Sequence, residues 1–97
     1  MPSVVVPDGT RISYALDGRR DGEPLLMVHG LGADTRGWAM QKRALGSRFR
    51  LVMVDNRGVG RSDRPEGPYD LEVMAADAIA ALDHAGYGSA HVLGASM

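Results

Sequence analysis

The residues best suited to covalent chemistry in this sequence are Gly94-Ala95-Ser96-Met97, which follow an apolar run. Two more residues, the second a glycine, would complete the pattern G-x-S-x-G. In that pattern a serine occupies a tight turn between a strand and a helix and presents its hydroxyl as a nucleophile at the edge of a sheet. The turn requires small neighbours, and Gly94 and Ala95 are small. Because Gly-x-Ser is common by chance, its meaning depends on the preceding sequence.

A second segment, His29-Gly30-Leu31-Gly32, also follows an apolar run. Attack of a serine on a carbonyl group needs hydrogen-bond donors for the oxygen that becomes negatively charged. Glycines let the backbone approach a substrate closely, and a loop after an earlier strand often provides one of two donor amides. We assign one donor to the amide of Met97 and the other to Leu31, with Gly32 as the alternative. Taken alone, this segment is more typical of a plain turn.

Three apolar runs would position these residues, at residues 25–28, 51–54 and 90–93. Continuous apolar runs are expected for strands that helices bury on both faces. His29, Asp55 and Ser96 each follow one of the runs. In a parallel sheet all three would therefore stand at the carboxyl edge, where chemistry gathers.

Two helices are predicted between the runs. The first covers residues 33–45, with Asp34 or Thr35 as N-cap and Gly46 as the C′ residue. The second follows Asp70, a good N-cap, and its apolar residues recur on one face with the helical period, whereas charged residues such as Asp77 lie away from the centre of that face. The residues of this face are Leu71, Met74, Ala75, Ala78, Leu82 and Ala85.

Residues 4–6 and 11–17 flank the turn Pro7-Asp8-Gly9 and predict an antiparallel hairpin. Strands that alternate with helices indicate right-handed crossovers and a largely parallel sheet. The predicted fold class is therefore α/β, an antiparallel hairpin followed by parallel strands with flanking helices, within one domain over residues 1–97.

Composition excludes several classes of function. The 97 residues, 44% hydrophobic and 24% charged, are typical of an ordinary soluble globular chain. A net charge of −1 favours neither nucleic acid nor a membrane surface as partner. The absence of cysteine excludes disulfides, thiol catalysis and Cys-ligated zinc. No basic segment with a long apolar stretch begins the chain, so we expect no signal peptide and a cytoplasmic location.

Four segments together resemble the amino-terminal part of an α/β-hydrolase, most of all the small serine esterases and the β-ketoadipate enol-lactonase group. They are LMVHGLG at residues 26–32, Trp38, VDNRGVGRSD at residues 54–63 and LGASM at residues 93–97. The resemblance implies that Ser96 is the nucleophile and that the Leu31 and Met97 amides form the oxyanion hole. It also implies that His29, Gly30 and Gly32 shape the oxyanion loop, that residues 55–63 form a structural turn, and that no metal or organic cofactor is needed.

The triad acid and base of that family follow the nucleophile in chain order, and neither is present in this sequence. His84 falls on the second helix, His91 lies at the opposite end of its strand from Ser96, about 15 Å away, and the resemblance makes His29 structural. We therefore expect the isolated chain to be inactive. The remaining carboxyl-terminal half of the domain, in the same or a second chain, would complete a hydrolase of a small ester or lactone.

Three alternatives remain open. A dinucleotide-binding half-domain would explain Gly30, Gly32 and Asp55, but the third glycine of its pattern would fall at Thr35. A phosphate loop at residues 58–62 lacks the required spacing and lysine, so Arg57 and the other loop arginines are more often structural. A non-catalytic fragment or ligand-binding module is also compatible with the sequence, although such a module would need neither Ser96 nor the glycine-rich loop.

Overall fold

The computed structural model describes residues 1–29, 35–67 and 69–94. The strands are β1 (Ser3–Val5), β2 (Arg11–Gly18), β3 (Glu23–Val28), β4 (Phe49–Val54) and β5 (His91–Gly94). The helices are a 3₁₀-helix, η1 (Thr35–Trp38), and two α-helices, α1 (Ala39–Leu45) and α2 (Leu71–His84).

The strands form one mixed sheet in the order β1-β2-β4-β3-β5. β1 and β2 form an antiparallel pair, β2 is antiparallel to β4, and β3 is parallel to both β4 and β5. This arrangement confirms the predicted fold class. It also excludes the dinucleotide-binding alternative, because β5 pairs with β3, whereas that fold places the third parallel strand beyond the second.

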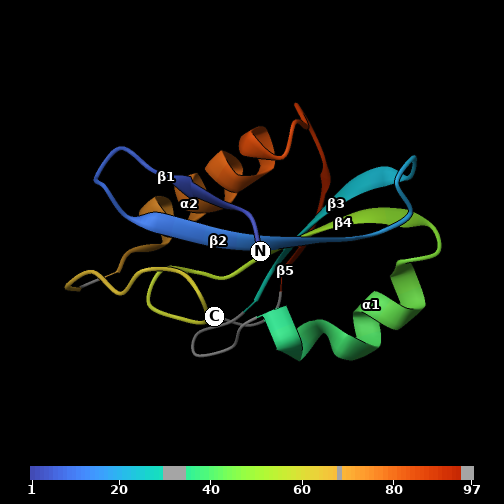
Figure 1. Ribbon diagram of the computed structural model, residues 1–97, viewed down its shortest axis with the longest axis horizontal. Helices are drawn as coiled ribbons and strands as arrows, with labels where there is room; N and C mark the ends of the chain where they lie inside the picture. The colour runs from blue at the N-terminus through green and yellow to red at the C-terminus, as the bar shows by residue number, and fades with distance from the viewer. Residues whose placement is uncertain (30–34, 68, 95–97) are drawn as a thin grey trace.

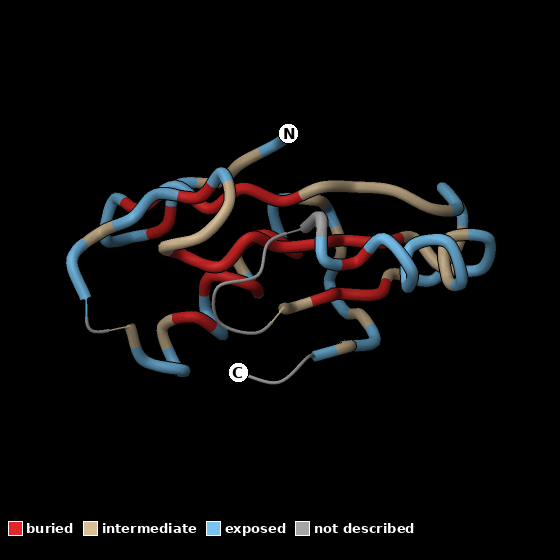
Figure 2. The backbone as a smooth tube through the Cα atoms, turned by 90° about the horizontal axis from the view of Figure 1, so that it is seen from below, coloured by how far each residue is buried: buried red, intermediate tan, exposed pale blue. Residues whose placement is uncertain are grey.

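The sheet has a helix on each face: α2 covers one and α1 covers the other (Figure 1). Alternate residues of β3 serve the two faces, since Leu26 belongs to the cluster under α2, whereas Leu25 and Met27 belong to the cluster with Trp38. The alternation follows from the period of two in a strand. It explains why the central strands are apolar without interruption and why they are the buried segments in the middle of Figure 2.

The first helix differs from the prediction. A 3₁₀-turn occupies residues 35–38, and α1 begins only after it, with Trp38 as N-cap and no side-chain capping bond. Thr35 is therefore not the N-cap of α1, and Asp34 lies outside the described residues. Gly46 is the C-cap with a φ of −65°, not a left-handed C′ residue. A glycine suits this position because a side chain here would meet the carbonyl oxygen of Lys42.

The second helix begins as predicted, since the side chain of Asp70 accepts a hydrogen bond from the Val73 amide at 2.8 Å. Its buried face is rotated from the predicted one. Leu71 is 66% exposed, whereas Asp77 is only 2% exposed. The reason is an ion pair described below, which draws Asp77 inward, and an open groove beside Leu71.

β5 forms the edge of the sheet, and among the described residues it pairs only with β3. Its Val92 is 68% exposed and lines an apolar groove of about 400 Å³ between α2 and β5. An open apolar edge strand is a template for pairing with another chain.

We therefore expect the purified 97-residue chain to self-associate, and Val92→Lys to shift it toward the monomer. Sedimentation equilibrium over a range of concentrations measures this. The matched control is Val5→Lys, because Val5 is 58% exposed on β1 at the opposite edge of the same sheet. Equal effects of the two substitutions, or a parent chain that stays monomeric, would contradict a specific role of the β5 edge.

Candidate active site

Three parallel strands end at the same level of the sheet. Val28 of β3 pairs with Val54 of β4 on one side and with Gly94 of β5 on the other. The ends of β3, β4 and β5 therefore lie at one edge, the carboxyl edge, and His29 and Asp55 follow β3 and β4 there, as predicted. In open α/β sheets this edge is where ligands bind.

Most of the predicted site residues lie outside the described residues. These are Gly30, Leu31 and Gly32 of the oxyanion loop, and Ser96 and Met97 after β5. Their roles remain predictions, and of the predicted set the structure describes only His29.

His29 is half-buried at the end of β3, and its imidazole packs against the indole of Trp38 with the ring centroids 4.4 Å apart. Its carbonyl oxygen accepts a hydrogen bond from Nδ2 of Asn56 at 2.9 Å. A side chain on Gly37 would collide with the His29 ring. Glycine at position 37 therefore lets the 3₁₀-turn lie close against His29.

Asp55 is buried, and its carboxylate points into its own loop, where Oδ2 accepts a hydrogen bond from the Arg61 amide at 3.0 Å. Gly60 has a φ of +55°, and any side chain there would collide with the Asp55 carboxylate. Ser62 Oγ donates to the Asp55 carbonyl oxygen at 2.6 Å and accepts from the Ser13 amide at 2.8 Å. These bonds indicate that Asp55 supports the loop.

Arg57 anchors the same loop to α2. Its Nε and Nη2 donate to the two carboxylate oxygens of Asp77 at 2.6 and 2.9 Å, and its Nη1 donates to Asp8 at 2.9 Å. The Arg57 and Asp77 side chains are 7% and 3% exposed. The hydrogen bonds that Arg57 donates to Asp77 raise the pKa of Arg57, so its guanidinium stays protonated.

Asp8 contributes a pH-dependent stabilisation. Its hydrogen bonds with Thr10 and Arg57 lower the pKa of its carboxyl from 3.8 to about 2. A carboxyl with a lowered pKa stabilises the folded state above its ordinary value, and the stabilisation is lost as the pH falls toward the folded-state pKa. We expect the free energy of unfolding of Asp8→Asn to fall less than that of the parent protein as the pH is lowered from about 4 to about 2. Thermal melts across this range measure the difference, and parallel curves for the two proteins would contradict it.

The other two histidines are away from the carboxyl edge. His84 Nδ1 lies 2.7 Å from the Tyr14 hydroxyl at the end of α2, and His91 Nε2 lies 2.6 Å from Glu23 Oε2 at the amino end of β5. Over residues 1–29, 35–67 and 69–94, no group of three His, Cys, Asp or Glu residues could hold a metal ion. Nor does this part of the chain contain a helix with the length and hydropathy to span a membrane.

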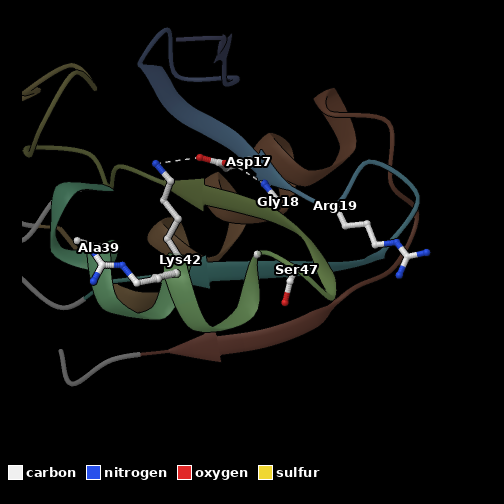
Figure 3. A pocket seen from close by; sticks show the side chains of 8 residues that line it. Asp17, Gly18, Arg19, Ala39, Lys42 and Ser47 are labelled. Atoms are coloured by element: carbon white, nitrogen blue, oxygen red, sulfur yellow. Dashed lines mark hydrogen bonds and ion pairs between the residues drawn. The ribbon is translucent and has the colours of Figure 1, made fainter.

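An open pocket of about 690 Å³ lies at the end of the sheet away from the carboxyl edge, beside the end of β2 and the end of α1 (Figure 3). Lys42 Nζ lies 2.8 Å from Asp17 Oδ2, and the hydrogen bond from Lys42 lowers the pKa of Asp17. Gly18, another lining residue, pairs with Arg50 near the start of β4. The pocket is therefore at the amino ends of the parallel strands and is separate from the candidate site.

Asn56 is not among the predicted site residues, yet it lies at the carboxyl edge with 2% of its surface exposed. Its only signal in the sequence is a polar side chain placed two residues after a buried strand. The bond to the His29 carbonyl joins two loops 27 residues apart, and that pairing has no local sequence pattern.

Known proteins are similar to this chain in both sequence and structure. A putative carbamate hydrolase, RutD, of Caulobacter segnis is 43% identical over 74 residues, which are 74% of this chain and 28% of the relative. A hydrolase from Pseudomonas aeruginosa PA01 superimposes with a TM-score of 0.91 at 33% identity, over 96% of this chain and 35% of that one. The enol-lactonase from Burkholderia xenovorans LB400 gives a TM-score of 0.88 at 34% identity, over 96% and 36%.

The chain thus spans about a third of the length of these relatives. The sequence model of the alpha/beta hydrolase fold matches residues 23–97, more than half of the chain. This match covers β3, β4 and β5 together with both α-helices, the elements that build the carboxyl edge. The chain belongs to the alpha/beta hydrolase family.

Proposed function

We propose that this chain is the amino-terminal part of a serine hydrolase that acts on a carboxylic ester or a lactone. The observation that carries the proposal is the common level at which β3, β4 and β5 end, within a chain of the alpha/beta hydrolase family. At that level Val28 and Gly94 are paired, so the residues that directly precede the proposed oxyanion loop and the proposed nucleophile turn lie at one edge. Similar proteins named as a carbamate hydrolase and an enol-lactonase support a carbonyl substrate.

In the proposed reaction, the Ser96 hydroxyl oxygen attacks the substrate carbonyl carbon and its proton passes to a histidine base. The amides of Leu31 and Met97 donate hydrogen bonds to the oxyanion. Collapse of the tetrahedral intermediate breaks the bond to the leaving oxygen, which takes the proton from the histidine. Water then hydrolyses the acyl-enzyme by the same steps and restores Ser96.

The acid and the histidine of the triad must come from outside this sequence. Neither His84 nor His91 is at the carboxyl edge, and the His29 ring packs against Trp38. We propose that the remainder of the hydrolase domain supplies both groups, in the same chain or in a second chain.

The test is covalent labelling of the full domain with a fluorophosphonate, followed by intact mass and peptide mapping. The proposal predicts one adduct, on Ser96, that a competing ester substrate prevents. Labelling elsewhere, or no labelling of a protein that hydrolyses esters, would contradict the assignment of Ser96.

A further inference from the structure

We propose that Asn56 is a positioning residue for the oxyanion loop, and that it acts by fixing the peptide group of His29. The inference rests on the proposed function, because the loop that begins at His29 is the one assigned to oxyanion binding. Asn56 would influence the proposed site without contacting the substrate.

The bond between Asn56 and His29 lies just beyond the last paired residues of two parallel strands. Backbone pairing of β3 with β4 reaches Val28 and Val54. The carbonyl of the next residue, His29, accepts its hydrogen bond from the Asn56 side chain, Nδ2 to O at 2.9 Å. The carboxamide thus extends the join between the strands by one residue into the loop.

Asn56 is itself held in place by its backbone neighbours. Its carbonyl oxygen accepts a bond from the Val59 amide at 3.1 Å, and the Asp55 amide donates to the Ser13 carbonyl at 3.0 Å. With 2% of its surface exposed, the side chain is enclosed by protein. It therefore provides a rigid reference point, as a group that positions another must.

The sequence after His29 is rich in glycine. Gly30 and Gly32 flank Leu31 in the sequence, and glycine restricts the backbone less than any other residue. Because a peptide group is planar, fixing the His29 carbonyl also fixes the plane of the bond that leads to Gly30. An external anchor at this point limits the directions that the following amides adopt.

The other end of the Asn56 carboxamide indicates that the side chain is not there for stability alone. Its Oδ1 is buried and has no hydrogen-bond partner among the described residues. A buried acceptor without a partner destabilises a protein by about 1–3 kcal/mol. An apolar side chain would avoid that penalty but would leave the His29 carbonyl without its donor, so the bond to His29 is what the amide provides.

The experiment compares three variants of the full hydrolase domain that contains residues 1–97. Asn56→Asp keeps the shape but places a carboxylate oxygen against the His29 carbonyl, and Asn56→Leu removes all polar atoms. Ser62→Ala is the control, because Ser62 bonds to Asp55 and Ser13 in the same loop without touching His29. The readouts are kcat, KM, melting temperature and hydrogen exchange of peptides that cover residues 29–32.

We expect both Asn56 variants to lower kcat by about 10- to 100-fold, with KM within about threefold of the parent. Both variants leave the His29 carbonyl without its donor, so both are expected to melt lower than the parent. Hydrogen exchange over residues 29–32 is expected to accelerate in both. Ser62→Ala is expected to melt lower, with unchanged kcat. If the role of Asn56 were merely structural, its variants would behave like Ser62→Ala, with a lower melting temperature and an unchanged kcat. Unchanged kcat in folded Asn56 variants of an active enzyme would overturn the inference. If the parent has no esterase activity, the proposed function fails, and hydrogen exchange alone then decides whether Asn56 fixes the loop.

Discussion

Asp77→Ala is expected to lower the free energy of unfolding by about 3–5 kcal/mol, the typical effect of removing one partner of a buried ion pair. The Arg57 guanidinium is 7% exposed and loses two of its hydrogen bonds when Asp77 is truncated. Asp8, on the turn between β1 and β2, is its only other partner among the described residues. Urea denaturation of the parent and the variant measures the difference.

The double variant Arg57→Met/Asp77→Leu shows whether Asp77→Ala is destabilised by the unpaired Arg57 charge or by the loss of packing. Replacing both members of a buried ion pair with apolar groups is often neutral or stabilising, so we expect the double variant to unfold at a higher urea concentration than Asp77→Ala. Arg19→Ala is a matched surface control, because Arg19 pairs with Asp21 at 2.6 Å where both side chains are more than half exposed. A double variant no more stable than Asp77→Ala, or a control with an equal loss, would contradict the role given to burial.

Ser96→Ala is expected to lower kcat for ester hydrolysis by roughly 10⁴- to 10⁶-fold in the full domain, as loss of a serine nucleophile does in other hydrolases. Without the hydroxyl, no acyl-enzyme forms, and only the oxyanion hole and substrate binding remain. Steady-state hydrolysis of a chromogenic ester measures kcat, and KM is expected to change little.

Ser47→Ala is the control for this substitution. Ser47 lines the pocket at the amino edge of the sheet, away from the carboxyl edge. We expect it to retain full activity. A Ser96→Ala enzyme that keeps more than about a tenth of the parent kcat would contradict a covalent role for Ser96.

Much of the fold follows from short-range patterns in the sequence. The runs at residues 25–28 and 51–54 became β3 and β4 because continuous apolar strands fit a sheet that helices cover on both faces. The level at which His29 and Asp55 stand follows in turn from the parallel pairing of these strands.

The features that the sequence did not indicate depend on contacts between distant residues. Asp77 was placed away from the buried face of α2 because a carboxylate is normally solvated, and its buried partner Arg57 stands 20 residues earlier. The 3₁₀-turn before α1 could not be predicted from a capping residue, because Trp38, the N-cap of α1, makes no side-chain capping bond. Likewise, the bond from Asn56 to the His29 carbonyl uses a backbone acceptor that every residue carries.

The sheet order has a consequence for the sequence of events during folding. β2 and β3 are joined by a short connection, yet β4 lies between them. Until residues 49–54 have been synthesised, β2 and β3 therefore lack the one strand that pairs with both of them in the folded sheet. β4 is thus the strand on which joining of the hairpin to the parallel strands depends, and a nascent chain that stops before it leaves one edge of β2 and both edges of β3 unpaired.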